Sequence, residues 1–118
     1  MPEFSVTTEI RDQPRVVIVR TVGYIDDHAG EKIKKVVQAL MEKGEKNFLF
    51  SFGGSPVINS TGIACLLEVC EEIGFSLQGK VAFCCLSKAI AEVFRMMGIT
   101  SVYQIYDQEE SALPGFSR

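Results

Sequence analysis

The sequence lacks a long apolar run, a dense basic cluster and a secretion signal, and each absence excludes a class of protein. No segment approaches the roughly 20 consecutive apolar residues of a membrane-spanning helix. No basic region followed by an apolar stretch marks a signal peptide at the start. The formal net charge of -3 argues against binding nucleic acid through released counterions. We therefore expect a cytoplasmic protein that contacts neither membranes nor nucleic acid directly.

Metal and cofactor sites are not indicated by the single histidine and four cysteines. No two cysteines form a C-x-x-C pair, and a zinc site of cysteine and histidine would lack ligands with only His28 available. Cys84 and Cys85 are adjacent in a predicted strand, so we expect their side chains to point to opposite faces. We predict no metal and no cofactor, and we interpret all four cysteines as buried, reduced, small apolar side chains.

The motifs of common enzymes are missing as well. A serine hydrolase would need His28 as its base, and no G-x-S-x-G turn presents a nucleophile. Gly53, Gly54 and Gly62 lack the lysine of the phosphate-binding loop G-x-x-x-x-G-K-[ST]. Three glutamates share the polar face of one predicted helix, at positions 68, 71 and 72, which is typical of solvated charge. We therefore predict that the protein is not an enzyme.

What the sequence does contain is enough apolar residues, 47% of 118, to build the core of one domain. We predict a single domain over 1–118, with a core from about residue 4 to 113 and a loose tail from Ser111. The segment 51–56 is predicted to be a loop. Apolar periodicity and turn residues predict strands near 4–11, 16–20, 48–50, 81–86 and 102–106, and helices near 29–43, from 60 to Gly74 or Gly79, and 88–97.

The order of these elements is β-β-α-β-α-β-α-β. Strands that alternate with helices after an initial strand pair indicate the α/β class. We expect a mixed, mostly parallel sheet of four to five strands with helices packed on it.

Two hydroxyl groups stand at a predicted strand-to-helix junction, in Asn59-Ser60-Thr61-Gly62. Side-chain oxygens here can accept from free backbone amides, so one interpretation is a helix cap. Loops at the carboxyl ends of parallel strands also carry function in α/β domains. A phosphate on Ser60 would lie beside free amides at the positive end of the helix dipole. It would add about -1.5 to -2 charges, enough to block a docked partner. The residues alone leave both interpretations open.

At these residues the sequence resembles the anti-sigma factor antagonist family, whose members are STAS domains. The family signature D-S-[ST]-G-[LI] corresponds to residues 59–63, and a second signature, G-x-[LI]-D, corresponds to Gly23-Tyr24-Ile25-Asp26. Residues 87–90 and 94–99 also match the family's last long helix. The resemblance extends from about Ser5 to about Leu113 and implies a STAS-like fold.

The resemblance implies a function as an anti-sigma factor antagonist. Such a protein binds a partner that is both anti-sigma factor and serine kinase while it is unphosphorylated, and this frees the sigma factor. Phosphorylation, here at Ser60 with Thr61 as the alternative, releases the kinase, and a phosphatase resets the switch. The implied partner-binding residues are Asp26, Asn59, Ser60, Thr61 and Gly62. Asn59 stands where the family has aspartate, which removes a negative charge beside the acceptor.

A second function stays open on the sequence. The chain fits a STAS binding module that is not phosphorylated, acting as a signalling scaffold or a small-ligand sensor. Asn59 and the Gly53-Gly54 pair motivate this alternative. A hydrolase that uses Ser60 is the weakest hypothesis, because the sequence positions no base.

Overall fold

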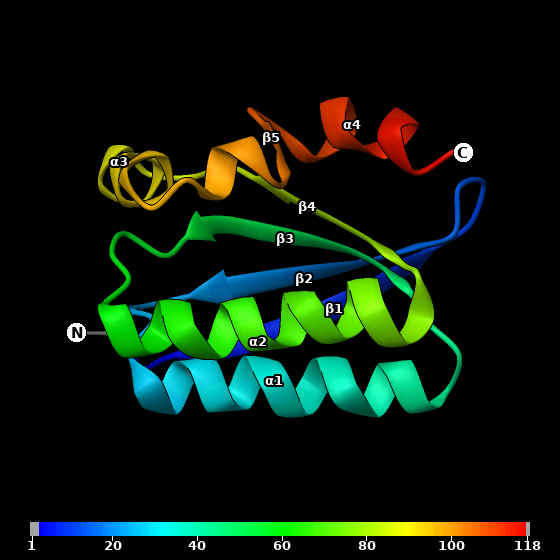
Figure 1. The fold of residues 1–118 in the computed structure, drawn as a ribbon, viewed down its shortest axis with the longest axis horizontal. Helices are drawn as coiled ribbons and strands as arrows, with labels where there is room; N and C mark the ends of the chain where they lie inside the picture. The colour runs from blue at the N-terminus through cyan, green and yellow to red at the C-terminus, as the bar shows by residue number, and fades with distance from the viewer. Residues whose placement is uncertain (1–2, 118) are drawn as a thin grey trace.

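A five-stranded sheet forms the centre of the molecule, and helices lie on both of its faces (Figure 1). The computed structural model describes residues 3–117. The predicted α/β class and mixed sheet are confirmed. The elements in order are β1 (Ser5–Arg11), β2 (Val16–Val22), α1 (Asp27–Glu42), β3 (Asn47–Gly54), α2 (Ser60–Leu77), β4 (Lys80–Cys84), α3 (Lys88–Met96), the 3-10 helix η1 (Ile99–Ser101), β5 (Gln104–Tyr106), α4 (Glu109–Ala112) and the 3-10 helix η2 (Leu113–Phe116).

The strands follow one another across the sheet in sequence order. β1 pairs antiparallel with β2, and every later neighbour pairs in parallel. Parallel neighbours need a crossover, which α1, α2 and α3 supply. The carboxyl ends of β2 and β3 therefore share one edge, where both helices that follow begin (Figure 1). β5 is shorter than predicted, since η1 forms before it.

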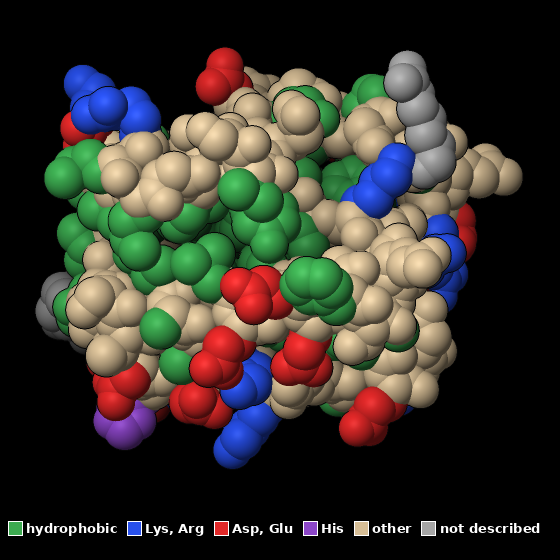
Figure 2. Space-filling view, in the orientation of Figure 1, with side chains coloured by type: hydrophobic (Ala, Val, Ile, Leu, Met, Phe, Trp, Pro, Cys, Tyr) green, Lys and Arg blue, Asp and Glu red, His purple; other side chains and the backbone are tan. Residues whose placement is uncertain are grey.

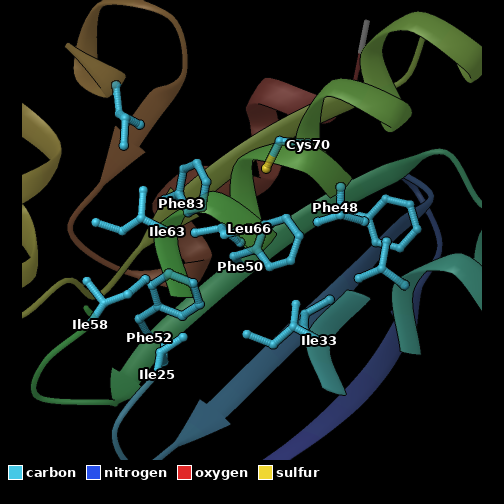
Figure 3. Close-up of a cluster of buried hydrophobic side chains, with 14 of the residues drawn as sticks. Ile25, Ile33, Phe48, Phe50, Phe52, Ile58, Ile63, Leu66, Cys70 and Phe83 are labelled. Atoms are coloured by element: carbon cyan, nitrogen blue, oxygen red, sulfur yellow. The ribbon is translucent and has the colours of Figure 1, made fainter. Parts of the chain in front are cut away.

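The main core lies between the sheet and the helices α1, α2 and α3. Phe48, Phe50 and Phe52 occupy alternate positions of β3, so all three rings point to this face (Figure 3). Phe83 stacks on Phe50 with ring centroids 5.5 Å apart and meets Phe94 of α3 edge-on at 5.0 Å. Burying side chains of this size stabilises the fold by about 1.5–3 kcal/mol each.

A smaller core covers the opposite face of the sheet and corrects one prediction. The expected loose tail from Ser111 is wrong for residues 111–117, because α4 and η2 pack there. Ala112 is fully buried and Phe116 is 6% exposed. They contact apolar side chains of β2, β3 and β4, and Arg118 lies outside the described residues. The ordered core therefore continues beyond residue 113.

Glu109 fixes the start of α4 to the sheet. Its carboxylate accepts two hydrogen bonds from the Arg20 guanidinium, at 2.8 and 2.9 Å, and one from the Ser51 hydroxyl at 2.7 Å. These contacts lower the pKa of Glu109 to about 2, with the Arg20 hydrogen bonds as the largest cause. A short C-terminal helix is thus held by charge-assisted bonds as well as by its apolar side chains.

Two predicted boundaries also differ. The loop expected over 51–56 is shorter, because β3 continues through Gly54. The helix expected to end at Gly74 or Gly79 continues past Gly74 and ends at Leu77. Gln78 takes the left-handed conformation there, and the Gly79 amide donates to the Ile73 carbonyl at 3.0 Å.

The paired cysteines overturn another expectation. Cys84 and Cys85 do not point to opposite faces, since their sulfur atoms lie 3.5 Å apart. β4 ends at Cys84, and Cys85 takes a left-handed conformation with φ of 64°, which turns its side chain back. Burial raises the pKa of the Cys84 thiol to about 12 and raises the pKa of Cys70 as well. These two cysteines are buried as predicted, whereas Cys65 and Cys85 are only partly buried.

Candidate functional site

The starts of α1 and α2 lie against each other at the carboxyl edge of the sheet. The Ile25 amide donates to the Val57 carbonyl at 3.1 Å, and the Asn59 amide donates to the Ile25 carbonyl at 3.1 Å. Ile25 and Ile58 thereby form a single parallel bridge beyond the ends of β2 and β3. The two sequence motifs, residues 23–26 and 59–63, are brought together by this bridge.

Gly62 makes this approach feasible. A Cβ atom at position 62 would lie 2.4 Å from the Ile25 carbonyl oxygen and 3.2 Å from the Asp26 carbonyl oxygen. Both distances are shorter than ordinary contacts, and the nearer atom belongs to the backbone. The first turn of α2 thus rests directly on the segment that leads into α1, and the glycine of the motif is required by packing.

Both helices begin with a side-chain cap. Asp26 Oδ1 accepts from the Ala29 amide at 2.9 Å and caps α1. Asn59 Oδ1 accepts from the Gly62 amide at 2.8 Å and caps α2. The same Asn59 oxygen accepts from the Thr61 hydroxyl at 2.9 Å. Asparagine therefore provides the cap that aspartate would provide at this position, without its charge.

The two hydroxyls of the motif differ in their surroundings. Ser60 and Thr61 are both exposed in the first turn of α2. The Thr61 hydroxyl donates to Asn59, whereas within residues 3–117 the Ser60 hydroxyl makes no hydrogen bond. Ser60 therefore offers an uncommitted hydroxyl beside the free amides at the start of an 18-residue helix.

The segment before Ser60 is held from two sides. The Ser55 and Thr21 hydroxyls, both buried, form a hydrogen bond of 2.7 Å between β2 and the residue that follows β3. The Ser87 hydroxyl donates to the Pro56 carbonyl at 2.8 Å and accepts from the Ile90 amide at 3.1 Å as the cap of α3. The contacts of Thr21 with Ser55 and of Ser87 with Pro56, which the sequence did not reveal, fix the connection that presents Ser60. The Ser87 cap agrees with the residue type expected before that helix.

His28 lies apart from this arrangement. It is exposed in the first turn of α1, as predicted, and lines a shallow hollow with Tyr24, Asp26 and Lys32. Over residues 3–117, histidine, cysteine and carboxylate side chains form no cluster of three or more that would hold a metal ion. None of the helices in that range is long and apolar enough to cross a membrane.

Comparison with known proteins defines the class. The family profile of the STAS domain matches residues 7–112, so the chain belongs to the STAS domain family. This confirms the family resemblance noted in the sequence. BtrV of Bordetella bronchiseptica, a protein named as an anti-sigma factor antagonist, is 26% identical over 94 residues, which is 80% of each chain.

Solved structures confirm the STAS-like fold. The TM1081 protein of Thermotoga maritima superposes with a TM-score of 0.86 at 19% identity, covering 96% of this chain and 95% of that one. The anti-sigma factor antagonist SpoIIAA in its unphosphorylated form gives a TM-score of 0.72 at 21% identity, covering 93% and 96%. The phosphorylated form of SpoIIAA from Bacillus also gives 0.72, at 21% identity and covering 93% and 97%. At these identities the likeness shows the fold alone.

Proposed function

We propose that this protein is an anti-sigma factor antagonist that is switched by phosphorylation of Ser60. The unphosphorylated form binds an anti-sigma factor that is also a serine kinase, phosphorylation releases it, and a phosphatase restores binding. In this proposal the chain is a cytoplasmic regulator and not an enzyme, and its partners are proteins. The free, exposed Ser60 hydroxyl at the start of α2 carries the proposal. The name of its relative BtrV supports it.

The surroundings favour Ser60 over Thr61 as the acceptor. Phosphorylation of Thr61 would break its hydrogen bond to Asn59 and would place phosphate oxygens near the Asn59 oxygen, which also accepts. A phosphate on Ser60 breaks no bond that the structure contains. It would lie beside unpaired amides and the positive end of α2, both of which favour an anion.

The neutral cap fits the same role. Asn59 Oδ1 already accepts from α2, which leaves the amide nitrogen of Asn59 as a hydrogen-bond donor next to the acceptor serine. We therefore expect Asn59 to be compatible with phosphorylation of Ser60.

Release of the partner then follows from surface charge. Val57, just before the motif, is exposed, so the patch around Ser60 includes apolar surface. Adding about -1.5 to -2 charges would oppose the burial of this surface under a partner.

The experiment is phosphopeptide mapping after incubation with the cognate kinase and ATP. We expect the phosphate on Ser60 in the wild type and in Thr61→Val, and none in Ser60→Ala. Ser60→Ala should melt within a few degrees of the wild type, because the hydroxyl it removes is unbonded. Phosphate on Thr61 would refute Ser60 as the acceptor, and no phosphate on either hydroxyl would refute the switch.

The alternative of a small-ligand sensor at Gly53-Gly54 has less support. Gly54 lies in β3, and a Cβ atom there would be 2.6 Å from the Thr21 carbonyl oxygen. Close packing of β3 on β2 therefore accounts for this glycine without a ligand.

A further inference from the structure

A second surface on α2 is open, apolar and separate from Ser60. A hollow of about 760 Å³ lies between the second half of α2, β4, the turn after α3, η1 and the two residues before β5. It begins at Leu67, about two helical turns beyond Ser60. In Figure 2 apolar side chains gather in this hollow, and acidic side chains lie along α2 below it.

The rim of the hollow is unusually exposed. Phe75 is 85% exposed, Val102 is 72% exposed and Met97 is 54% exposed. A contiguous apolar patch of this kind on a soluble domain marks a surface that another molecule covers. Nothing in the Ser60 switch uses these side chains.

Gly74 keeps the hollow open. It lies inside α2, where glycine is less favourable than alanine. A Cβ atom at Gly74 would meet nothing within 4 Å, so packing does not require a glycine there. A larger side chain at position 74 would instead project into the hollow. The glycine therefore leaves space in the hollow for a bound molecule.

Charge around the hollow has one sign. Glu71 lines it and forms no ion pair within the described chain. The neighbouring glutamates are already engaged, since Glu68 pairs with Lys34 at 2.6 Å and Glu72 accepts from Gln38 at 2.8 Å. Among residues 3–117, no lysine or arginine lines the hollow. The carboxyl end of α3, also at its rim, adds a partial negative charge.

We propose that this hollow binds an amphipathic helix of a partner protein, with apolar side chains on one face and a lysine or arginine facing Glu71. Helices that dock in grooves use apolar anchors at i, i+3, i+4 and i+7. A second copy of this chain fits less well, because a symmetric contact would bring acidic surfaces together without a cation from the hollow. The proposal does not rest on phosphorylation of Ser60.

The test is selection from a displayed library of helical peptides of about 20 residues. The full chain serves as bait, and the affinity of each enriched peptide is then measured for the wild type and for Gly74→Leu, which fills the hollow. We expect enriched peptides to carry apolar residues at helical spacing and a basic residue, and to lose binding to Gly74→Leu at least tenfold. Circular dichroism checks that Gly74→Leu is folded.

Matched charge variants complete the test. Glu71→Gln should weaken an enriched peptide two- to fivefold, the range of an exposed ion pair, whereas Glu68→Gln should leave affinity unchanged. Ser60→Asp should also bind it normally, which separates this proposal from the phosphorylation switch. Enriched peptides without the pattern, equal binding to Gly74→Leu, or a wild-type dimer that Gly74→Leu dissociates would overturn the proposal.

Discussion

Replacing Gly62 by alanine tests the packing on which the candidate site depends. The added methyl group would lie 2.4 Å from the Ile25 carbonyl oxygen and 3.0 Å from its carbonyl carbon. Because the neighbour is backbone, relief requires the first turn of α2 to move away from residues 25–26. That movement would strain the 3.1 Å hydrogen bond from the Asn59 amide to the Ile25 carbonyl. Overpacking of this kind costs about 1–3 kcal/mol.

Gly74 provides the matched control, since it lies in the same helix and a Cβ atom there meets nothing within 4 Å. Gly74→Ala should stabilise the protein by about 0.5–1 kcal/mol through helix propensity. The same propensity gain offsets part of the clash in Gly62→Ala. The difference in unfolding free energy between the two variants therefore estimates the clash, at about 1–3 kcal/mol.

Urea unfolding followed by far-ultraviolet circular dichroism measures this difference, provided that both variants keep the wild-type slope. We expect the midpoint of Gly62→Ala to fall below that of the wild type and the midpoint of Gly74→Ala to rise above it. If both variants are stabilised to the same extent, α2 does not rest on residues 25–26 as described, and the packing role of the motif glycine is wrong.

Three further changes test contacts around the site and the C-terminal helix. Asn59→Ala should lower the free energy of unfolding by about 0.5–2 kcal/mol in thermal or urea unfolding, and Asn59→Asp should keep the cap. If both variants lose the same stability, the capping role is refuted. Thr21→Val should lower the free energy of unfolding by about 1–3 kcal/mol, because it leaves the buried Ser55 hydroxyl without a partner. Adding Ser55→Ala should recover most of this loss. If the effects of the two substitutions simply add in the double-mutant cycle, the hydrogen bond between Thr21 and Ser55 does not stabilise the fold. The folded pKa of Glu109, about 2, lies below its ordinary value of 4.5, so its stabilising effect is complete above pH 4.5 and disappears as the pH falls through 2. Unfolding measured across this range should show a shallower pH dependence in Glu109→Gln than in the wild type, and equal slopes would refute the role of Glu109.

Local features of this fold could be predicted from the sequence, and those that depend on distant contacts could not. The caps Asp26 and Asn59 bind amides three residues away, so their residue types and the apolar periodicity that follows were sufficient. The C-terminal helix α4 has four residues, too few for a periodic pattern. Its main anchor joins Glu109 to Arg20, 89 residues earlier, and no local pattern encodes that distance.

The cysteine pair was misjudged for a related reason. Alternation of side chains holds only while the backbone stays extended, and a single left-handed residue, Cys85, reverses it. Non-glycine residues rarely take that conformation, so the sequence carried no warning.

For the candidate site, the sequence identified the motif and the structure adds the physical difference between its hydroxyls. Family resemblance alone favoured Ser60 over Thr61. The hydrogen bond from Thr61 to Asn59 now provides a separate reason, since it leaves Ser60 as the uncommitted group. The supports at Ser55 and Ser87 were not predictable, because each joins its partner across more than 30 residues.

These supports bear on how the proposed switch would work. The backbone around Ser60 is fixed by the Asn59 cap, by the contact of Gly62 with Ile25 and by the tether from Ser87 to the residue before Val57. A phosphate on Ser60 would find free amides already in place and would need no rearrangement of α2. We therefore expect the phosphorylated protein to keep its fold and to differ mainly in surface charge. Partner release would then weaken with added salt, because screening reduces the repulsion between exposed charges. A switch that worked by unfolding the first turn of α2 would instead respond little to salt and would show a loss of helix on phosphorylation.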